Sequence, residues 1–390
     1  MTDAELLALA REYGTPLYVF DADAFRRRAA QVRAALGAGI RLCYSMKANP
    51  FLLRCLPREI SMLEVCSPGE LTVCENAGAD LSSIVFSGVN KTADSIRRAM
   101  DDRVAVFTAE SPLHAERIEQ EAAVRGIRVP VLLRLTSDNQ FGMDEELILE
   151  ICSRREERYP HIDFVGLHYF SGTLKKRPTL VGRELQKLEA AADRIRCETG
   201  LSMDRMEYGP GLWIDYFGEA PEEAESALLA EVSELLRPFG ERFDLTVEMG
   251  RFFAAPCGSY LTTVMDVKTN CGYHYAIVDG GLHQMNYDGQ MKGTQVPDLR
   301  RLTGEAGPEE DWCICGSLCT PNDVLVRRVS MPAPRLGDVL AFCRTGAYSI
   351  NEGFALLLSR DAPAVIICSE GEGVRVAREH VRLDPLNTPK

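Results

Sequence analysis

Short runs of apolar, often β-branched residues recur along the first two thirds of the chain. They are continuous rather than alternating, which is typical of strands buried on both faces. Eight such runs begin at residues 41, 62, 84, 104, 129, 163, 205 and 244. Segments with helical spacing separate them, such as 111–126, which begins with Ser-Pro and ends on glycine. This alternation over residues 22–250 predicts a (β/α)8 TIM barrel, as in α/β proteins, rather than a doubly wound open sheet.

The pattern changes after about residue 250. Short apolar runs now stand between Gly/Pro turns with little helix, as in a mostly β domain. The runs are 257–269, 273–281, 311–318, 338–349, 364–370 and 373–380. We therefore expect a barrel domain at 22–250 and a β-rich C-terminal domain at 251–390 that also includes residues 1–21. The segment 289–311 is loop-like, and we expect either a mobile loop or a cover for a site.

Composition narrows the classes of function. The 390 residues are 46% hydrophobic and 26% charged, an ordinary globular balance, and the formal net charge is −13. Such a charge disfavours nucleic acid and anionic membranes as partners. The N-terminus has no signal-peptide pattern, and no apolar run is long enough to span a membrane. The 13 cysteines are then expected to be reduced and mostly buried, in a cytoplasmic protein.

The predicted barrel places candidate chemistry at the C-terminal ends of its strands. A lone strand-end lysine is more often a solvated residue, so the whole set of side chains decides the interpretation. The strand ends carry Lys47, Cys66, Ser67, Ser87, Gly88, Arg134, His168, Ser171, Gly172, Thr173, Gly209, Pro210, Gly211, Glu248 and Arg251. Small-residue turns and an arginine suit a phosphate, a carboxylate keeps a pyridine nitrogen protonated, and a lysine can form a Schiff base. Together they indicate a site for a phosphorylated aromatic cofactor.

Five motifs strengthen this interpretation. They are YSMKAN (44–49), HYFSGT (168–173), EMGR (248–251), CGSLCTPNDVL (315–325) and GAYS (346–349). In this order they resemble the fold-type III pyridoxal-phosphate decarboxylases. That family includes diaminopimelate, ornithine and arginine decarboxylases, with alanine racemase as a more distant relative. The resemblance runs from about residue 15 to about residue 380 and implies pyridoxal 5′-phosphate as cofactor.

The resemblance also implies roles around the cofactor ring. Lys47 would hold the cofactor as a Schiff base, His168 would stack on its ring, and Glu248 would pair with the pyridine nitrogen. Cys319 would reach the site from the partner subunit of an obligate homodimer and deliver a proton after carbon dioxide leaves. The remaining cofactor-binding positions, most of them around the phosphate, would be Ser171, Gly209, Gly211, Gly250, Arg251 and Tyr348.

Two departures from the family pattern concern the phosphate and the substrate. The usual turn of three glycines is interrupted by Pro210, which removes one backbone donor. The diamino-acid enzymes carry an acidic residue after the catalytic cysteine, where it grips the far amine of the substrate. Here Thr320 and Pro321 follow Cys319, and the acid Asp323 comes later. Thr320 and Asp323 are the candidate substrate-binding residues.

The leading hypothesis is an amino-acid decarboxylase similar to diaminopimelate decarboxylase, acting on a small-molecule substrate. The alternative is a decarboxylase of a modified or carrier-protein-bound amino acid in siderophore or antibiotic biosynthesis. Loss of the acid–ammonium contact favours the alternative, because a mismatched substrate leaves a polar group unpaired. A racemase is disfavoured, since racemases use a tyrosine where this chain has Cys319. A non-catalytic relative is disfavoured because the motif residues are intact.

The spacing of Cys313, Cys315 and Cys319 raises the question of a metal site. Structural zinc sites usually combine two pairs of cysteine or histidine ligands. No second pair lies nearby in the sequence. We therefore expect no metal.

Overall fold

The computed structural model describes residues 1–289 and 293–389. The chain forms two compact units. One comprises Arg28–Trp213 and Glu223–Phe253, and the other comprises Met1–Arg27, Ile214–Glu222 and Ala254–Lys390. The predicted limits, 22–250 for the barrel and 251–390 with 1–21 for the β-rich domain, differ from these units mainly at 214–222 and stay a prediction.

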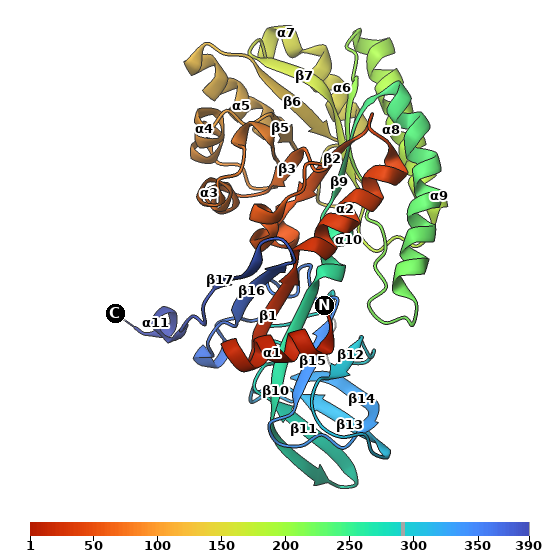
Figure 1. Ribbon diagram of the computed structural model, residues 1–390. Coiled ribbons are helices and arrows are strands. Elements are labelled where there is room, and N and C mark those ends of the chain that lie inside the picture. The colour runs from red at the N-terminus through yellow and green to blue at the C-terminus, as the bar shows by residue number, and fades with distance from the viewer. Residues whose placement is uncertain (290–292, 390) are drawn as a thin grey trace. The chain divides into compact units, whose positions relative to one another are not determined.

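The first unit contains a closed barrel of eight parallel strands, which confirms the predicted (β/α)8 fold and excludes the open sheet (Figure 1). The strands are β2 Arg41–Ser45, β3 Met62–Val65, β4 Ile84–Phe86, β5 Val106–Ala109, β6 Val129–Arg134, β7 Ile162–Phe170, β8 Arg205–Gly209 and β9 Asp244–Met249. The barrel closes where β2 pairs with β9, with Cys43 opposite Glu248. All eight strands coincide with the apolar runs of the sequence.

Helices alternate with the strands and lie outside the ring (Figure 1). In α3 and α5 the limits follow local signals, because a serine caps the start and a left-handed glycine ends the last turn. In α5, Ser111 accepts a hydrogen bond from the His114 N–H and Gly126 ends the helix. The helices are α2 Ala22–Leu36, α3 Pro68–Ala77, α4 Ala93–Asp101, α5 Pro112–Arg125, α6 Glu145–Ser153, α7 Arg155–Arg158, α8 Pro178–Thr199, α9 Pro221–Arg242 and α10 Arg251–Ala254.

Apolar side chains of successive barrel strands pack into one buried cluster. It consists of Cys43, Met62, Val85, Val106 and Leu132. Each fully buried aliphatic side chain of this kind stabilises the fold by about 1.5–3 kcal/mol. The barrel is therefore a packed core, and chemistry is confined to its strand ends.

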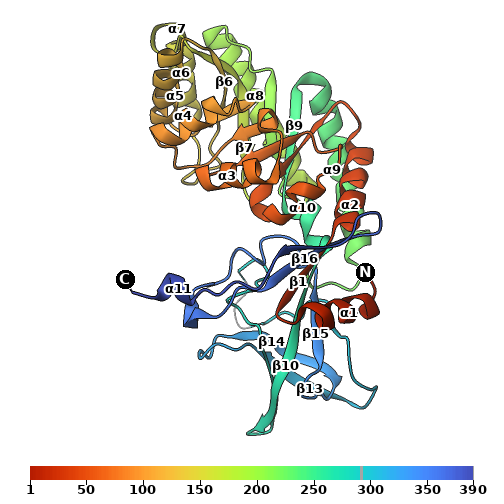
Figure 2. The ribbon, with the colours of Figure 1, turned by 60° about the vertical axis from the view of Figure 1, so that its left-hand side comes forward.

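The second unit is built on a nine-stranded mixed sheet. Its main path runs β14-β13-β11-β10-β1-β16-β17, while β15 pairs with β10 and β12 pairs with β15. The long strand β10 pairs with β1 through one part of its length and with β11 through the rest (Figure 2). The strands are β1 Leu17–Asp21, β10 Gly258–Asn270, β11 Tyr273–Val278, β12 Leu299–Arg301, β13 Glu309–Cys315, β14 Val324–Pro332, β15 Val339–Cys343, β16 Ala364–Ser369 and β17 Gly373–Arg378. Helices α1 Asp3–Tyr13 and α11 Asp384–Asn387 complete the unit.

Part of the segment 289–311 is not a loop. It contains β12 and the start of β13, while residues 290–292 lie outside the described residues. The short strand β12 pairs with β15 and reads Leu-Arg-Arg, so its sequence has no apolar alternation to reveal it. Among the described residues, no helix is long and apolar enough to cross a membrane.

Candidate active site

Lys47 lies just past the end of β2, in a single 3-10 turn at Met46–Ala48. Its side chain is 36% exposed, and its amino group forms an ion pair with the Glu64 carboxylate. The same nitrogen lies 3.5 Å from Cys66 Sγ and 3.8 Å from Glu248 Oε1. Lys47 is therefore not a solvated strand end, because its amino group faces two carboxylates and a thiol.

Glu248 stands on β9, the strand beside β2, and its carboxylate is held from two sides. Ser45 Oγ donates a hydrogen bond of 2.7 Å to Oε1, and His168 Nε2 lies 3.2 Å from Oε2. Burial alone raises the pKa of Glu248, but the charge of Lys47 and the hydrogen bonds from His168 and Ser45 lower this pKa below its ordinary value. Glu248 is therefore an anion at neutral pH, as the partner of a protonated ring nitrogen must be.

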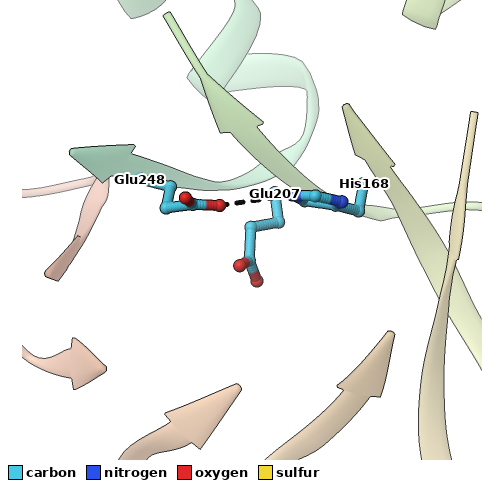
Figure 3. Close-up of side chains that lie close together, drawn as sticks. All are labelled: His168, Glu207 and Glu248. Carbon is cyan, nitrogen blue, oxygen red and sulfur yellow. Dashed lines mark hydrogen bonds and ion pairs between the residues drawn. The ribbon is translucent and has the colours of Figure 1, made fainter. Parts of the chain in front are cut away.

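Glu207, on β8, is a second buried carboxyl beside this pair. Its side chain is fully buried, and neither carboxyl oxygen has a hydrogen-bond partner among the described residues. Burial, and then the charge of Glu248, raise the pKa of Glu207 well above its ordinary value. Figure 3 shows its carboxyl group directed away from the line that joins His168 and Glu248. Burial and the neighbouring Glu248 charge therefore favour the protonated, neutral form of Glu207.

His168, Glu207 and Glu248 are also spaced as metal ligands would be. One ligand atom from each lies within 4.8 Å of the others. His168 and Glu248 are already in contact with each other, and Ser45 donates to the same Glu248 carboxylate. Such a carboxylate, fixed in place and anionic, suits an N–H donor of a ring as well as it suits a cation.

The turn after β8 packs closely against the loop after β7. Gly211 has a left-handed φ of +58°, and a Cβ there would lie 2.0 Å from the Gly172 carbonyl oxygen. A Cβ on Gly209 would lie 2.7 Å from Phe170 Cδ2. The Lys175 N–H donates a 2.9 Å hydrogen bond to the Gly211 carbonyl. The structure thus joins the Ser171 loop to the glycine turn, two segments predicted to bind phosphate.

A carboxylate that the sequence analysis missed lies at this junction. Glu184, on α8, accepts hydrogen bonds from the Ser171 hydroxyl, from Lys175 Nζ at 2.7 Å and from the Tyr208 hydroxyl at 2.5 Å. Lys175 is buried and places a cation beside Ser171. In the sequence, Glu184 is one charge on a helix face and resembles an ordinary solvated residue.

The motif that includes Arg251 begins the short helix α10 at the end of β9. Arg251 is buried. A Cβ on Gly250 would lie 2.8 Å from Ala48 Cβ, next to Lys47. Glycine at this position therefore lets β9 approach the turn that holds the lysine.

The other predicted residues lie in the second unit. Cys319 and Thr320 lie on a turn between β13 and β14, where Cys319 is exposed. Asp323 is buried beneath this turn and accepts hydrogen bonds from the Leu282 and Leu318 N–H groups at 2.8 and 2.7 Å. The structure gives Asp323 a role in holding the turn, and its contact with substrate stays a prediction.

Tyr348, the last predicted phosphate contact, also belongs to the second unit. Its backbone adopts a left-handed φ of +64°, which is uncommon for a residue with a bulky side chain. Strained residues of this kind cluster at functional sites. The proposed contact of Tyr348 with phosphate stays a prediction.

Glu64 and Ser45 were also missed as site residues. Glu64 is a single acid within the apolar run MLEVCS, and Ser45 lies inside the lysine motif, two residues before Lys47. Both point toward the site because alternate strand residues face the same side. A charged residue inside an otherwise apolar strand was the available signal for Glu64.

Comparison with known proteins agrees with this geometry. The family model for the pyridoxal-binding domain of pyridoxal-dependent decarboxylases matches residues 22–255, more than half of the chain. The chain belongs to this family. It is therefore an enzyme, a pyridoxal-phosphate-dependent amino-acid decarboxylase, and pyridoxal 5′-phosphate is its cofactor.

Two curated relatives of this decarboxylase cover most of its length. L-glutamyl-[BtrI acyl-carrier protein] decarboxylase of Niallia circulans is 26% identical over 97% of this chain and 94% of its own. Diaminopimelate decarboxylase of Vibrio cholerae is 28% identical over 89% of this chain and 86% of its own. Diaminopimelate decarboxylase of M. jannaschii, solved with L-lysine, has the same fold with a TM-score of 0.86 at 22% identity, over 96% of this chain and 92% of its own.

The residues of the decarboxylase fit pyridoxal phosphate. Lys47 supplies an amino group at the strand ends, Glu248 supplies a buried anion, and His168 supplies a flat ring in contact with that anion. The packed turn at Gly211, with Ser171 and the Lys175 cation joined through Glu184, is the predicted place for its phosphate.

Proposed function

We propose that this decarboxylase acts on an amino acid whose far end carries no free ammonium group, such as a modified or carrier-protein-bound amino acid. The observation that carries the proposal is the state of Asp323. This acid is the one that remains near Cys319, and its two oxygens accept backbone N–H groups of Leu282 and Leu318. Thr320, which takes the place of the acid in the diamino-acid enzymes, is neutral. The turn therefore offers no carboxylate committed to an ammonium group.

The N. circulans relative supports this proposal, because its name describes a glutamyl group on an acyl-carrier protein. Free diaminopimelate is the second candidate, since several curated relatives and solved structures are diaminopimelate decarboxylases. The two candidates differ at the far end of the substrate, where diaminopimelate carries an ammonium and a carboxylate.

The chemistry at the reacting end is the same for both candidates. Bound pyridoxal phosphate supplies an electron sink for the bond between Cα and the carboxylate. In our proposal Glu248 holds a proton on the ring nitrogen and stays anionic because Lys47, His168 and Ser45 lower its pKa. Lys47 holds the cofactor through its amino group, and Glu64 accepts a hydrogen bond from that group when it is free.

We further propose that the enzyme is a homodimer whose sites are completed across the interface by Cys319. The exposure of Cys319 supports this role, since a thiol on the surface of one chain can reach a second chain. Its Sγ would deliver the proton that replaces the lost carboxylate at Cα. A cytoplasmic location stays a prediction and is supported by the 13 cysteines, all within the described residues, none of which forms a disulfide.

Carbon dioxide release by the cofactor-loaded enzyme tests the substrate proposal. The panel would hold meso-diaminopimelate, ornithine, lysine, arginine, free glutamate, citrate-linked diamino acids and a glutamyl group on an acyl-carrier protein. Release from a modified or carrier-bound amino acid alone, abolished in Lys47→Ala, supports the proposal. Efficient turnover of free diaminopimelate would overturn it and establish the second candidate.

A further inference from the structure

We propose that Cys313 and Cys315 form a disulfide reversibly when the enzyme meets a hydroperoxide. The two cysteines lie on β13 with one residue between them, and their sulfur atoms are 3.6 Å apart. Neither residue has a part in the decarboxylation proposed above. This inference is independent of the substrate.

The strand geometry brings the two thiols together. Residues i and i+2 of a strand face the same side, so Cys313 and Cys315 share one half-buried face while Trp312 and Ile314 are buried on the other. A disulfide requires a sulfur–sulfur distance of about 2.05 Å, so the sulfurs must approach by about 1.5 Å. The register of β13 against β14 is irregular at Ile314, and such irregular pairing bends a strand locally.

The two thiols differ in acidity in the way that a reactive pair requires. The hydrogen bond between the two thiols lowers the pKa of Cys313 to about 7, with help from the charge of Arg327 and against the effect of burial. The hydrogen bond to Cys313, together with burial, raises the pKa of Cys315 far above its ordinary value. In our proposal Cys313 is the thiolate that attacks an oxidant, and Cys315 is the thiol that follows.

The reaction balances with a hydroperoxide as the oxidant. The Cys313 thiolate attacks one peroxide oxygen, the O–O bond breaks, and the leaving oxygen takes a proton, which gives Cys313 as a sulfenic acid. The Cys315 sulfur then attacks the Cys313 sulfur. The S–O bond breaks, hydroxide leaves and takes the Cys315 proton to form water, and the S–S bond forms. Two thiols are oxidised by two electrons, and the peroxide is reduced by the same two.

The location connects this pair to the segment that carries Cys319. Strand β13 ends at Cys315, and the turn bearing Cys319 begins at once, with the Gly316 N–H bonded to the Asp323 carbonyl at 3.0 Å. Closing the disulfide therefore restrains the strand end from which this turn starts.

Peptide mass spectrometry of the holoenzyme tests the proposal. The enzyme is treated with hydrogen peroxide, its remaining thiols are blocked with iodoacetamide, and it is digested. We expect the peptide to have lost two hydrogens at Cys313 and Cys315, to carry a blocking group on Cys319 alone where Cys319 belongs to the same peptide, and to regain both thiols with dithiothreitol. The wild-type chain is sufficient for this measurement, so the result does not depend on whether a variant folds.

Matched serine variants identify the two cysteines that form the disulfide. Cys313→Ser and Cys315→Ser should each abolish the loss of hydrogens, whereas Cys271→Ser, which removes an exposed cysteine of the same unit, should leave it unchanged. If iodoacetamide still blocks both Cys313 and Cys315 after peroxide treatment, the proposal is overturned. A disulfide from either cysteine to Cys319, or sulfinic acids without the disulfide, would overturn it equally.

Discussion

Glu207 and Glu248 offer carboxyl oxygens that lie within 4.8 Å of each other inside the barrel, and their pKa values move in opposite directions. The difference follows from their contacts. Glu248 receives the charge of Lys47 and hydrogen bonds from His168 and Ser45, whereas neither oxygen of Glu207 has a hydrogen-bond partner among the described residues. One proton between two buried carboxyls is the expected result of like charges at this distance.

The neutral state of Glu207 predicts a pH-dependent effect on stability. Its pKa is raised in the folded enzyme, so its stabilising contribution is complete below the unfolded pKa and is lost as pH rises toward the folded pKa. The Glu207→Met variant has no carboxyl at this position, so its stability does not fall with pH for this reason. Its unfolding free energy should therefore increase relative to wild type from pH 5 to pH 8, by at most about 1.4 kcal/mol per pH unit.

Urea unfolding followed by circular dichroism at several pH values measures this difference. Glu241→Met, at an exposed glutamate on α9, is the matched control. Equal pH slopes for the two variants would show that Glu207 is ionised in the folded enzyme.

Ser45 should contribute to the acid limit of catalysis, after the larger effects of Lys47 and His168. Removing its hydrogen bond in Ser45→Ala takes away one of the contacts that lower the pKa of Glu248. Because activity requires the anion, which exists above this pKa, the acid limb of the kcat/KM profile should move to higher pH by about one unit. Ser233→Ala, at a buried serine on α9 that donates to the Leu229 carbonyl, should leave the limb in place. An unshifted limb in Ser45→Ala would contradict the role of Glu248.

Lys47 should be indispensable for both cofactor attachment and turnover. Lys47→Ala removes the amino group and should lower the rate of carbon dioxide release by at least ~10³-fold. It should also abolish the visible absorbance of the lysine-bound cofactor. Lys176→Ala removes an exposed lysine that lies over Trp213 and should retain both. Retained absorbance in Lys47→Ala would assign the attachment to another lysine.

Gly211 and Gly200 form a matched pair for testing the turn after β8, which is predicted to bind the cofactor phosphate. Both have left-handed φ angles, +58° and +69°, but a Cβ at Gly200 meets nothing within 4 Å, whereas at Gly211 it meets the Gly172 carbonyl oxygen at 2.0 Å. Gly200→Ala should cost only the backbone strain of about 1 kcal/mol. Gly211→Ala should cost more and should weaken pyridoxal phosphate binding about tenfold or more, since the turn must move. Titration of each apoenzyme with pyridoxal phosphate measures the affinity of the two variants. Equal affinities for Gly200→Ala and Gly211→Ala would refute the claim that close packing at Gly211 supports cofactor binding.

Subunit mixing tests the shared active site. Lys47→Ala and Cys319→Ala should each be nearly inactive as homodimers. Mixed one to one and allowed to exchange, they should recover about one quarter of wild-type activity, because half of the dimers are mixed and each holds one intact site. No recovery, with exchange confirmed by differently tagged chains, would place Cys319 in the site of its own subunit.

The barrel could be predicted because each of its strands is a continuous apolar run and each intervening segment has helical spacing. The strands of the β-rich unit were harder to predict from the sequence. Strand β14, Val324–Pro332, contains two arginines and was missed, and β12 is too short for a periodic signal. The short strand β12 is stabilised by pairing with the distant strand β15, and such pairing has no local pattern in the sequence.

The site residues likewise fall into those that the sequence reveals and those that only the structure reveals. Lys47, His168 and Glu248 end recognisable strands, so the family resemblance located them. Glu207, Glu64 and Glu184 have no distinctive sequence context, and their importance arises only from burial and from neighbours that the fold supplies. Asp323 shows the converse, because its position in a motif suggested substrate contact, whereas its oxygens accept backbone N–H groups.

The closure of the barrel between β2 and β9 sets the order in which this enzyme matures. Lys47 follows β2, and its charged neighbour Glu248 is carried by β9, the last strand of the ring. During synthesis the chain must therefore extend beyond residue 250 before these two side chains can meet. If Lys47 and Glu248 hold the cofactor as proposed, a nascent or truncated chain that lacks β9 has the lysine without its buried anion, and the complete cofactor site exists only once the barrel has closed.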